Sequence, residues 1–203
     1  MIVRMFSAAA AAAFLAAGVP ASAQQMSDSY DFLEAVRDRD GNKVQGFLAD
    51  KSKRIVNARS RNAAAEGALH IAANRSDSLY LRVILQQDDA NPNLQDGRGN
   101  TALILAAGRS WQEGVEILIR YKANVNLANQ SGETPLIRAV QVHNVEIAEA
   151  LLKAGADPDR SDNISGKSAR DYALESTRWP AMVKLLTNAA KVRGAAGAAG
   201  PRL

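Results

Sequence analysis

The sequence contains no cysteine among its 203 residues. The protein therefore cannot form disulfide bonds, and packing and hydrogen bonds must supply all of its stability. The same absence excludes a thiolate nucleophile, a metal held by cysteine and a covalently attached c-type haem. It also excludes a lipid anchor attached to cysteine.

Histidine is scarce as well, with two in the whole chain. His70 and His143 fall on different parts of the pattern described below, so we expect no shared metal. Gly97 and Gly99 lack the third glycine and the strand-to-helix setting of a dinucleotide loop. Two pairs of nearby aspartates lack the loop of a calcium site, and no serine has a base at a recognisable spacing. We predict no catalytic residues, no metal and no cofactor.

Charge of one sign does not dominate the chain. Lys and Arg number 25, Asp and Glu number 21, and the formal net charge is +4. No block of basic residues with interleaved aromatics occurs, which is the pattern typical of nucleic-acid binding. We therefore expect no nucleic-acid partner.

Long apolar runs are missing except at the start of the chain. Residues 1–23 contain a basic residue, an apolar run from Ala8 to Val19, a proline and a small-x-small sequence ending at Ala23. This pattern predicts a secretory signal peptide cleaved after Ala23. An uncleaved membrane anchor is the alternative, but the run is short beside the roughly 20 residues that span a bilayer. We expect export to the periplasm, or secretion, with no membrane span after the signal is removed.

A repeat is what the sequence does contain. Thr101 and Thr134 open similar segments, NTALILAA and GETPLIRAV, and are 33 residues apart. Similar first halves occur at 66–73, 100–107, 133–140 and 167–174. Similar second halves occur in VILQQDDANPN, ILIRYKANVN and ALLKAGADPD. A fifth, divergent copy occupies residues 30–50.

A period near 33 with a T-P-L-H-x-A core and an L-L-x-x-G-A-D-x-N tail resembles the ankyrin repeat. The resemblance implies an all-α solenoid, in which each repeat is a β-turn followed by two antiparallel helices. We expect a single domain at 24–190. Its repeats are expected at about 28–60, 61–94, 95–127, 128–160 and 161–190. The Ala- and Gly-rich residues 191–203 are expected to form a flexible tail.

The chemistry of individual residues agrees with this interpretation. Thr101 and Thr134 can cap helix starts with their hydroxyls, and Pro135 fits the first helical turn. The small Ala106 lets neighbouring helices approach closely. His70 matches the histidine of the motif, which the resemblance places in a hydrogen-bond network that supports the turns.

The resemblance also implies a binding surface, the concave face made of turn tips and the exposed side of each first helix. Position by position, it assigns to this surface Asn74, Arg75, Arg98, Asn100, Arg109, Gln130, Glu133, Arg138 and Gln141. Arginine is frequent at protein hot spots and pairs well with carboxylates, so we expect a partner protein with an acidic segment. Ordinary solvated arginines are the alternative. Trp111 either anchors a partner or packs over its loop, and Trp179 is expected to cover the C-terminal end of the stack.

The sequence therefore predicts a non-catalytic, monomeric protein-binding module of the periplasm. Three alternatives stay open. The protein could be an inhibitor or immunity protein for a toxin or enzyme, a small-molecule- or metal-binding enzyme on the same scaffold, or a secreted effector that acts on a host.

Overall fold

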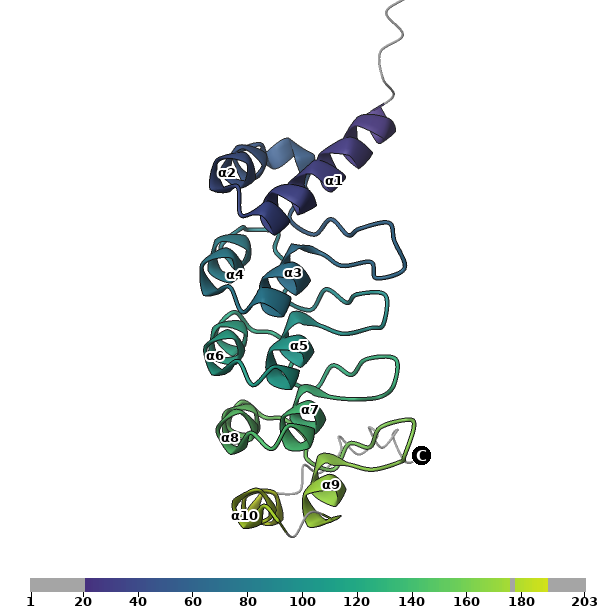
Figure 1. Ribbon diagram of the computed structural model, residues 1–203, viewed down its shortest axis with the longest axis vertical. Helices are drawn as coiled ribbons and strands as arrows, with labels where there is room; N and C mark the ends of the chain where they lie inside the picture. Colours follow the sequence, from purple (N-terminus) through teal and green to yellow (C-terminus); the bar gives the residue numbers. More distant parts are fainter. Residues whose placement is uncertain (1–20, 176–177, 190–203) are drawn as a thin grey trace, which may run out of the picture.

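The computed structural model describes residues 21–175 and 178–189, which form five consecutive helix pairs stacked in one direction (Figure 1). The helices are α1 (Ala21–Asp38), α2 (Gly41–Ala49), α3 (Ala68–Arg75), α4 (Ser78–Leu85), α5 (Ala102–Gly108), α6 (Gln112–Arg120), α7 (Pro135–Gln141), α8 (Val145–Lys153), α9 (Ala169–Glu175) and α10 (Pro180–Asn188). A short 3-10 turn, η1 (Lys51–Lys53), follows α2. The described residues contain no β-strand, and the predicted all-α solenoid is confirmed.

The helices form two columns. The first helix of each pair, here called the inner helix, packs against the inner helices before and after it. The second helices, here called outer helices, stack in the same way from α4 to α10. The loops that link the pairs project to one side in Figure 1 and are here called fingers. They are finger 2 (54–67), finger 3 (86–101), finger 4 (121–134) and finger 5 (154–168).

The first inner helix begins earlier than the repeat pattern predicts. Residues 24–27, which precede the first expected repeat, belong to α1, which runs from Ala21 to Asp38 without a glycine or proline to interrupt it. The predicted cleavage point after Ala23 falls in the first turn of this helix. The rest of the predicted signal peptide, and the predicted tail at 191–203, lie outside the described residues.

Buried threonines start two of the inner helices. The Thr101 hydroxyl accepts a hydrogen bond from the backbone N–H of Ile104, and the Thr134 hydroxyl accepts one from the N–H of Ile137. Both donor–acceptor distances are 3.2 Å. Pro135 is the first residue of α7, where its missing N–H costs no hydrogen bond. Each cap satisfies a backbone donor that the first turn would otherwise leave unpaired inside the protein.

His70 replaces this cap in the second repeat, where Gly67 has no side chain to offer. Its Nδ1 accepts from the Gly67 N–H at 3.0 Å, and its Nε2 lies 3.0 Å from the carbonyl oxygen of Asn100 in finger 3. The proton therefore sits on Nε2. The ring is fully buried, and this burial lowers its pKa although the Asn100 carbonyl acts in the opposite direction. The predicted role of His70 in a turn-supporting network is confirmed.

An Asp or Asn side chain closes each finger from within. Asp96 Oδ1 accepts from the N–H of Arg98 and of Asn100, both at 2.8 Å. Asn129 makes the same pair of bonds in finger 4, and Asn62 accepts one such bond in finger 2. The corresponding residue of finger 5, Asp162, accepts from three backbone N–H groups.

Tyr172 and Ser165 add hydroxyl donors to Asp162, at 2.6 Å and 2.9 Å. Burial alone would raise the pKa of this carboxyl, but these donors lower it to about 2. Finger 5 is therefore fixed by a charged group even though it carries one residue more than finger 4.

Backbone hydrogen bonds join each finger to the one before it. In every case an N–H donates to a carbonyl of the preceding finger. The pairs are Gly97 to Ala64 at 2.7 Å, Gln130 to Arg98 at 3.1 Å, and Asn163 to Ser131 at 2.8 Å. The contact is close, since a Cβ on Gly97 would lie 2.1 Å from the carbonyl oxygen of Ala63.

A second series of bonds joins the repeats where the outer helices end. The side-chain oxygens of asparagines accept backbone N–H groups of the next repeat. The pairs are Asn57 with Asn91 at 2.9 Å, Asn93 with Asn124 at 2.7 Å, and Asn126 with Asp157 at 2.7 Å. Together with the finger bonds, they fix each repeat to its neighbour on two sides.

Arg170 ends the stack in the fifth repeat, where the motif has leucine. Its Nε lies 2.6 Å from Asp159 Oδ1, and it also donates to the backbone carbonyl of Ala189 at the end of α10. A leucine here would face no further repeat. The arginine instead satisfies backbone carbonyl groups at the end of α10, the last helix that the structure describes.

Trp111 takes the second of its two expected places, packed over its own loop, whereas Trp179 does not cover the end of the stack. Trp111 is half-buried and lies against Gly114 in the first turn of α6. Trp179 precedes α10 and stacks on His143 of the previous repeat, with ring centroids 4.6 Å apart. The expectation that Trp179 covers the outer end of the stack is wrong, because its ring packs back toward α7 and α8.

Glycine in α6 makes room for Trp111, which leads to a test of packing. A Cβ at position 114 would lie 2.1 Å from a Trp111 ring carbon. We expect Gly114→Ala to lower the free energy of unfolding by about 1–3 kcal/mol through overpacking. Gly46→Ala is the matched control, because an added Cβ in α2 meets nothing within 4 Å. It should raise stability by about 0.5–1 kcal/mol. Urea unfolding followed by circular dichroism measures both, and effects of equal sign would contradict the packing described.

His70 predicts a loss of stability in mild acid. Because its pKa is lowered in the folded state, the unfolded chain takes up the proton first as pH falls. The contribution is complete above about pH 7 and is lost progressively below about 6.5. We expect His70→Gln to be less stable at neutral pH and to lose less stability on going from about pH 7 to pH 5.

Unfolding at a series of pH values checks this, with His143→Gln as the control that keeps His70 intact. If His70→Gln loses as much stability as the wild type over this interval, the buried neutral histidine does not explain the acid response.

Candidate functional site

Most of the predicted binding residues line one cleft between fingers 3 and 4 and the inner helices α5 and α7. The cleft, here called the finger cleft, has a volume of about 550 Å³. It is lined by seven of the nine predicted residues: Asn74, Arg98, Asn100, Arg109, Gln130, Glu133 and Arg138. Side chains far apart in the sequence meet here because they recur at related positions of consecutive repeats.

Arg138 enters the cleft from α7 and lies against α5. Its Nη1 donates to Gln141 Oε1 at 2.8 Å and lies 3.5 Å from Glu133 Oε1. The space for its guanidinium comes from Gly108, where a Cβ would lie 3.2 Å from Arg138 Nη2. Both members of the ion pair are partly exposed, so the pair positions Arg138 more than it stabilises the fold.

Arg109 is the next basic group of the cleft, and a chain of polar contacts holds it. Its Nε and Nη2 both lie 3.4 Å from Asn74 Oδ1. Asn74 Nδ2 donates to Glu66 Oε1 at 3.0 Å, and Glu66 lies 3.8 Å from Arg37. The exposed side of the inner helices is therefore connected from the first repeat to the third.

Two guanidinium groups of the cleft have no counter-charge among residues 21–175 and 178–189. Arg98 has its backbone fixed by Asp96, but its exposed side chain forms no ion pair there. Arg109 contacts only the neutral amide of Asn74. The single carboxylate that lines the cleft, Glu133, is already shared by Arg138 and by Asn129 Nδ2. The cleft is thus positively charged on balance.

The remainder of the cleft combines an apolar floor with amide groups. Ile104 is buried and Leu105 is half-buried on α5. Asn129 Nδ2 donates to Asn100 Oδ1 at 2.9 Å, and Gln130 Nε2 donates to the Gly97 carbonyl at 3.1 Å. These bonds tie the rim residues of one finger to the finger before it.

Two predicted residues lie outside this lining. Arg75 turns toward the first repeat and donates to the backbone carbonyl of Arg37. Gln141 contacts the cleft only through its bond to Arg138. Arg75 and Arg109 hold the same position in successive repeats, but their side chains lie differently. The hydrogen bond of Arg75 to the Arg37 carbonyl explains the difference, and the sequence does not reveal it.

Sequence reasoning missed three lining residues, namely Ile104, Leu105 and Asn129. A signal for two of them exists in the period. Leu105 stands 33 positions before Arg138, and Asn129 stands 33 positions after Asp96. The same structural position thus carries leucine in one repeat and arginine in the next.

The chemistry available in the finger cleft is that of recognition. Guanidinium, amide and apolar groups can bind a carboxylate, a peptide backbone and an aliphatic side chain. In the part of the chain that the structure describes, no cluster of three histidine or acidic side chains is placed to hold a metal ion. No described helix is both long and apolar enough to cross a bilayer.

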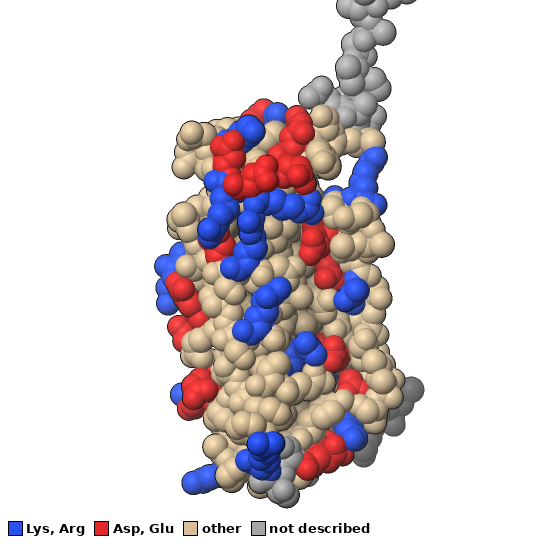
Figure 2. Space-filling view, in the orientation of Figure 1, with Lys and Arg blue, Asp and Glu red and all other residues tan. Residues whose placement is uncertain are grey.

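The charge pattern extends beyond the cleft. Figure 2 shows basic side chains spread down one face of the stack, whereas acidic side chains gather beside α1 and α2. A partner that follows the stack from end to end would meet groups of both signs.

The repeat region is similar to segments of known proteins. A family model for ankyrin repeats, in three copies, matches residues 69–162. Human BCL-6 corepressor-like protein 1 is 36% identical over 114 residues, which are 56% of this chain and 6% of that protein. Zebrafish (Danio rerio) neurogenic locus notch homolog protein 1 is 36% identical over 126 residues, 62% of this chain and 5% of that protein. The E3 ubiquitin-protein ligase KEG of Arabidopsis thaliana is 30% identical over 131 residues, 64% of this chain and 8% of that protein.

This chain therefore spans only a small fraction of the length of the curated relatives it matches. What it shares with them is the stack of repeats. The segment matched by the family model begins in α3 and ends in finger 5, which is the part of the stack that holds the finger cleft. The chain is an ankyrin repeat protein, and its repeats form a protein–protein interaction module.

Proposed function

We propose that the finger cleft binds an acidic segment of a partner protein and that the protein has no catalytic role. The observation that carries this proposal is the pair Arg98 and Arg109, two guanidinium groups of one cleft with no described carboxylate partner. A guanidinium presents donors in a fixed fork that matches a carboxylate, and hydrogen bonds between charged groups are stronger than neutral ones.

The geometry of the cleft narrows the partner further. Leu105 lines the same cleft as these two arginines and Arg138. A segment that places a carboxylate beside an aliphatic side chain would pair with an arginine and cover Leu105 at the same time. Such mixed contacts, with an arginine next to a desolvated apolar group, are typical of binding hot spots.

We also propose that the protein is exported to the periplasm and acts there as a monomer. The support is the pattern of residues 1–23, with its basic start, apolar run and small-x-small sequence. Mass spectrometry of the protein purified from the producing cells should find Gln24 as the first residue. A chain that retains Met1 would contradict cleavage. Recovery of the full-length chain in the cytoplasmic fraction of the cells would contradict export.

A charge reversal tests the binding surface. We expect Arg98→Glu combined with Arg109→Glu to lose a partner that the wild type captures in a crosslinking pull-down, because both substitutions place a carboxylate where an acidic segment would lie. The matched control is Arg120→Glu with Lys122→Glu, which makes the same charge change at exposed positions of α6 and the loop after it.

Circular dichroism should show that both variants are folded. A partner that is captured equally by the wild type and both double variants would contradict the finger cleft as its binding site. A partner lost by both variants alike would indicate a long-range charge effect without a specific site.

A further inference from the structure

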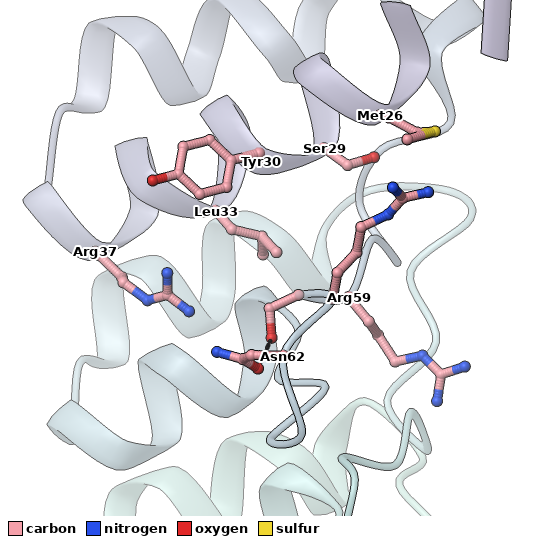
Figure 3. Close-up of a pocket in the computed structure, with 9 residues that line it drawn as sticks. Met26, Ser29, Tyr30, Leu33, Arg37, Arg59 and Asn62 are labelled. Atoms are coloured by element: carbon pink, nitrogen blue, oxygen red, sulfur yellow. Dashed lines mark hydrogen bonds between the residues drawn. The ribbon is translucent and has the colours of Figure 1, made fainter. Parts of the chain in front are cut away.

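A second groove lies at the N-terminal end of the stack, between α1 and finger 2 (Figure 3). It has a volume of about 500 Å³ and is separate from the finger cleft. Met26, Tyr30 and Leu33 contribute apolar surface from α1, while Arg59 and Asn62 lie on the opposite side, on finger 2 (Figure 3). We call it the end groove.

The end groove occupies the place where a preceding finger would stack. Fingers 3, 4 and 5 each pack on the finger before them, but finger 2 has α1 above it (Figure 1). α1 has 18 residues, whereas the other inner helices have seven or eight, and its extra turns overhang finger 2 without covering it. Met26 and Tyr30 are 41% and 65% exposed in this overhang.

The backbone pattern of the fingers leaves one donor open here. Gly97, Gln130 and Asn163 each donate an N–H to the finger before their own. The residue after each donor supplies the carbonyl that accepts from the next finger: Arg98 follows Gly97 in finger 3, and Ser131 follows Gln130 in finger 4. Ala64 is that acceptor in finger 2, so the corresponding donor is the N–H of Ala63. Among the described residues, this N–H has no acceptor.

The charge of the end groove is of one sign. Arg37, Arg59 and Arg61 line it, and no acidic residue does. Arg37 forms ion pairs with Glu34 and Glu66. Arg59 donates a hydrogen bond to the Gln95 carbonyl at 3.2 Å. Arg61, exposed at the finger, has no partner within the described part of the chain.

We propose that the end groove receives an extended segment of a partner protein, which takes the place of the absent finger. Its backbone carbonyl accepts the Ala63 N–H, a large apolar side chain packs between Met26 and Tyr30, and a neighbouring carboxylate pairs with Arg61. The addition of an extended segment to an open backbone edge is a general mode of peptide recognition, in which backbone bonds give affinity and side-chain pockets give specificity.

A second copy of this chain fits the groove less well. Its exposed finger edge is finger 5, where Ile164 is 80% exposed and could enter the apolar part. However, the carboxylate of Asp162, which lies next to that edge, already accepts hydrogen bonds from backbone groups of finger 5 and from the Tyr172 hydroxyl on α9. Asp162 of such a copy would therefore not be free to pair with the three arginines. The long α1 also extends over finger 2, on the side where the finger of a stacked repeat would lie (Figure 1).

Selection from a phage-displayed library of random linear peptides tests the proposal with the full chain, purified as the producing cell processes it. We expect the selected peptides to share an acidic residue next to a large apolar one. For a synthetic peptide of this kind, Tyr30→Ser and Arg61→Glu should each weaken binding by roughly tenfold or more in fluorescence anisotropy. Replacing its acidic residue by the corresponding amide should weaken binding in the same way.

The controls separate the end groove from the finger cleft. Arg98→Glu should leave the affinity for the selected peptide unchanged, and the peptide should shift the amide NMR signal of Ala63. Tyr30 and Arg61 are exposed, so their variants should keep the wild-type circular dichroism spectrum.

Three results would overturn the proposal. The first is that the selected peptides bind the Tyr30→Ser and Arg61→Glu variants as tightly as the wild type. The second is that Arg98→Glu alone abolishes their binding, which would support the finger cleft alone. The third is that sedimentation shows self-association of the chain and that Tyr30→Ser abolishes it, in which case a second copy is the occupant.

Discussion

The structure depends on the fact that none of its later helices can bury an apolar face alone. From α3 to α10 each helix has only seven to nine residues, which is too short for stability in water without tertiary packing. Leu69, Leu103 and Leu136 are buried only because a neighbouring repeat covers them. Stability is therefore a sum of contacts between adjacent repeats, and each buried polar group that crosses between repeats has to be satisfied.

This constraint also explains where a binding surface can form. Stacking fixes the identity of the positions between repeats, such as Ala106 and Ala139, which are fully buried. The positions that face the fingers carry no such restriction, so Leu105 and Arg138 occupy the same place in successive repeats. Gly108 then makes space for the guanidinium of Arg138, and the finger cleft results from a side chain of one repeat lying against the helix of another.

The sequence period predicted the repeats, and the capping preference of threonine predicted the starts of α5 and α7. The helix pairs, the role of His70 and most residues of the cleft lining were predicted from the resemblance of that period to the ankyrin repeat. The departures come from contacts that the period does not encode. Arg75 bonds to a carbonyl of a repeat whose spacing is irregular, and Trp179 stacks on an exposed histidine. The length of α1 also escaped prediction, because the repeat pattern has no information on what precedes the first copy.

The two ends of the stack meet the same requirement in different ways. At the C-terminal end, Arg170 pairs with Asp159 and donates to backbone carbonyls at the end of α10. Asp162 accepts hydrogen bonds from backbone N–H groups of finger 5. Charged side chains of the fifth repeat and the turn before it therefore satisfy these backbone groups. At the N-terminal end, α1 covers the apolar core but leaves Arg61 and the N–H of Ala63 without a partner in the described chain. The N-terminal end thus keeps the side chain of Arg61 and the N–H of Ala63 free to recognise another chain.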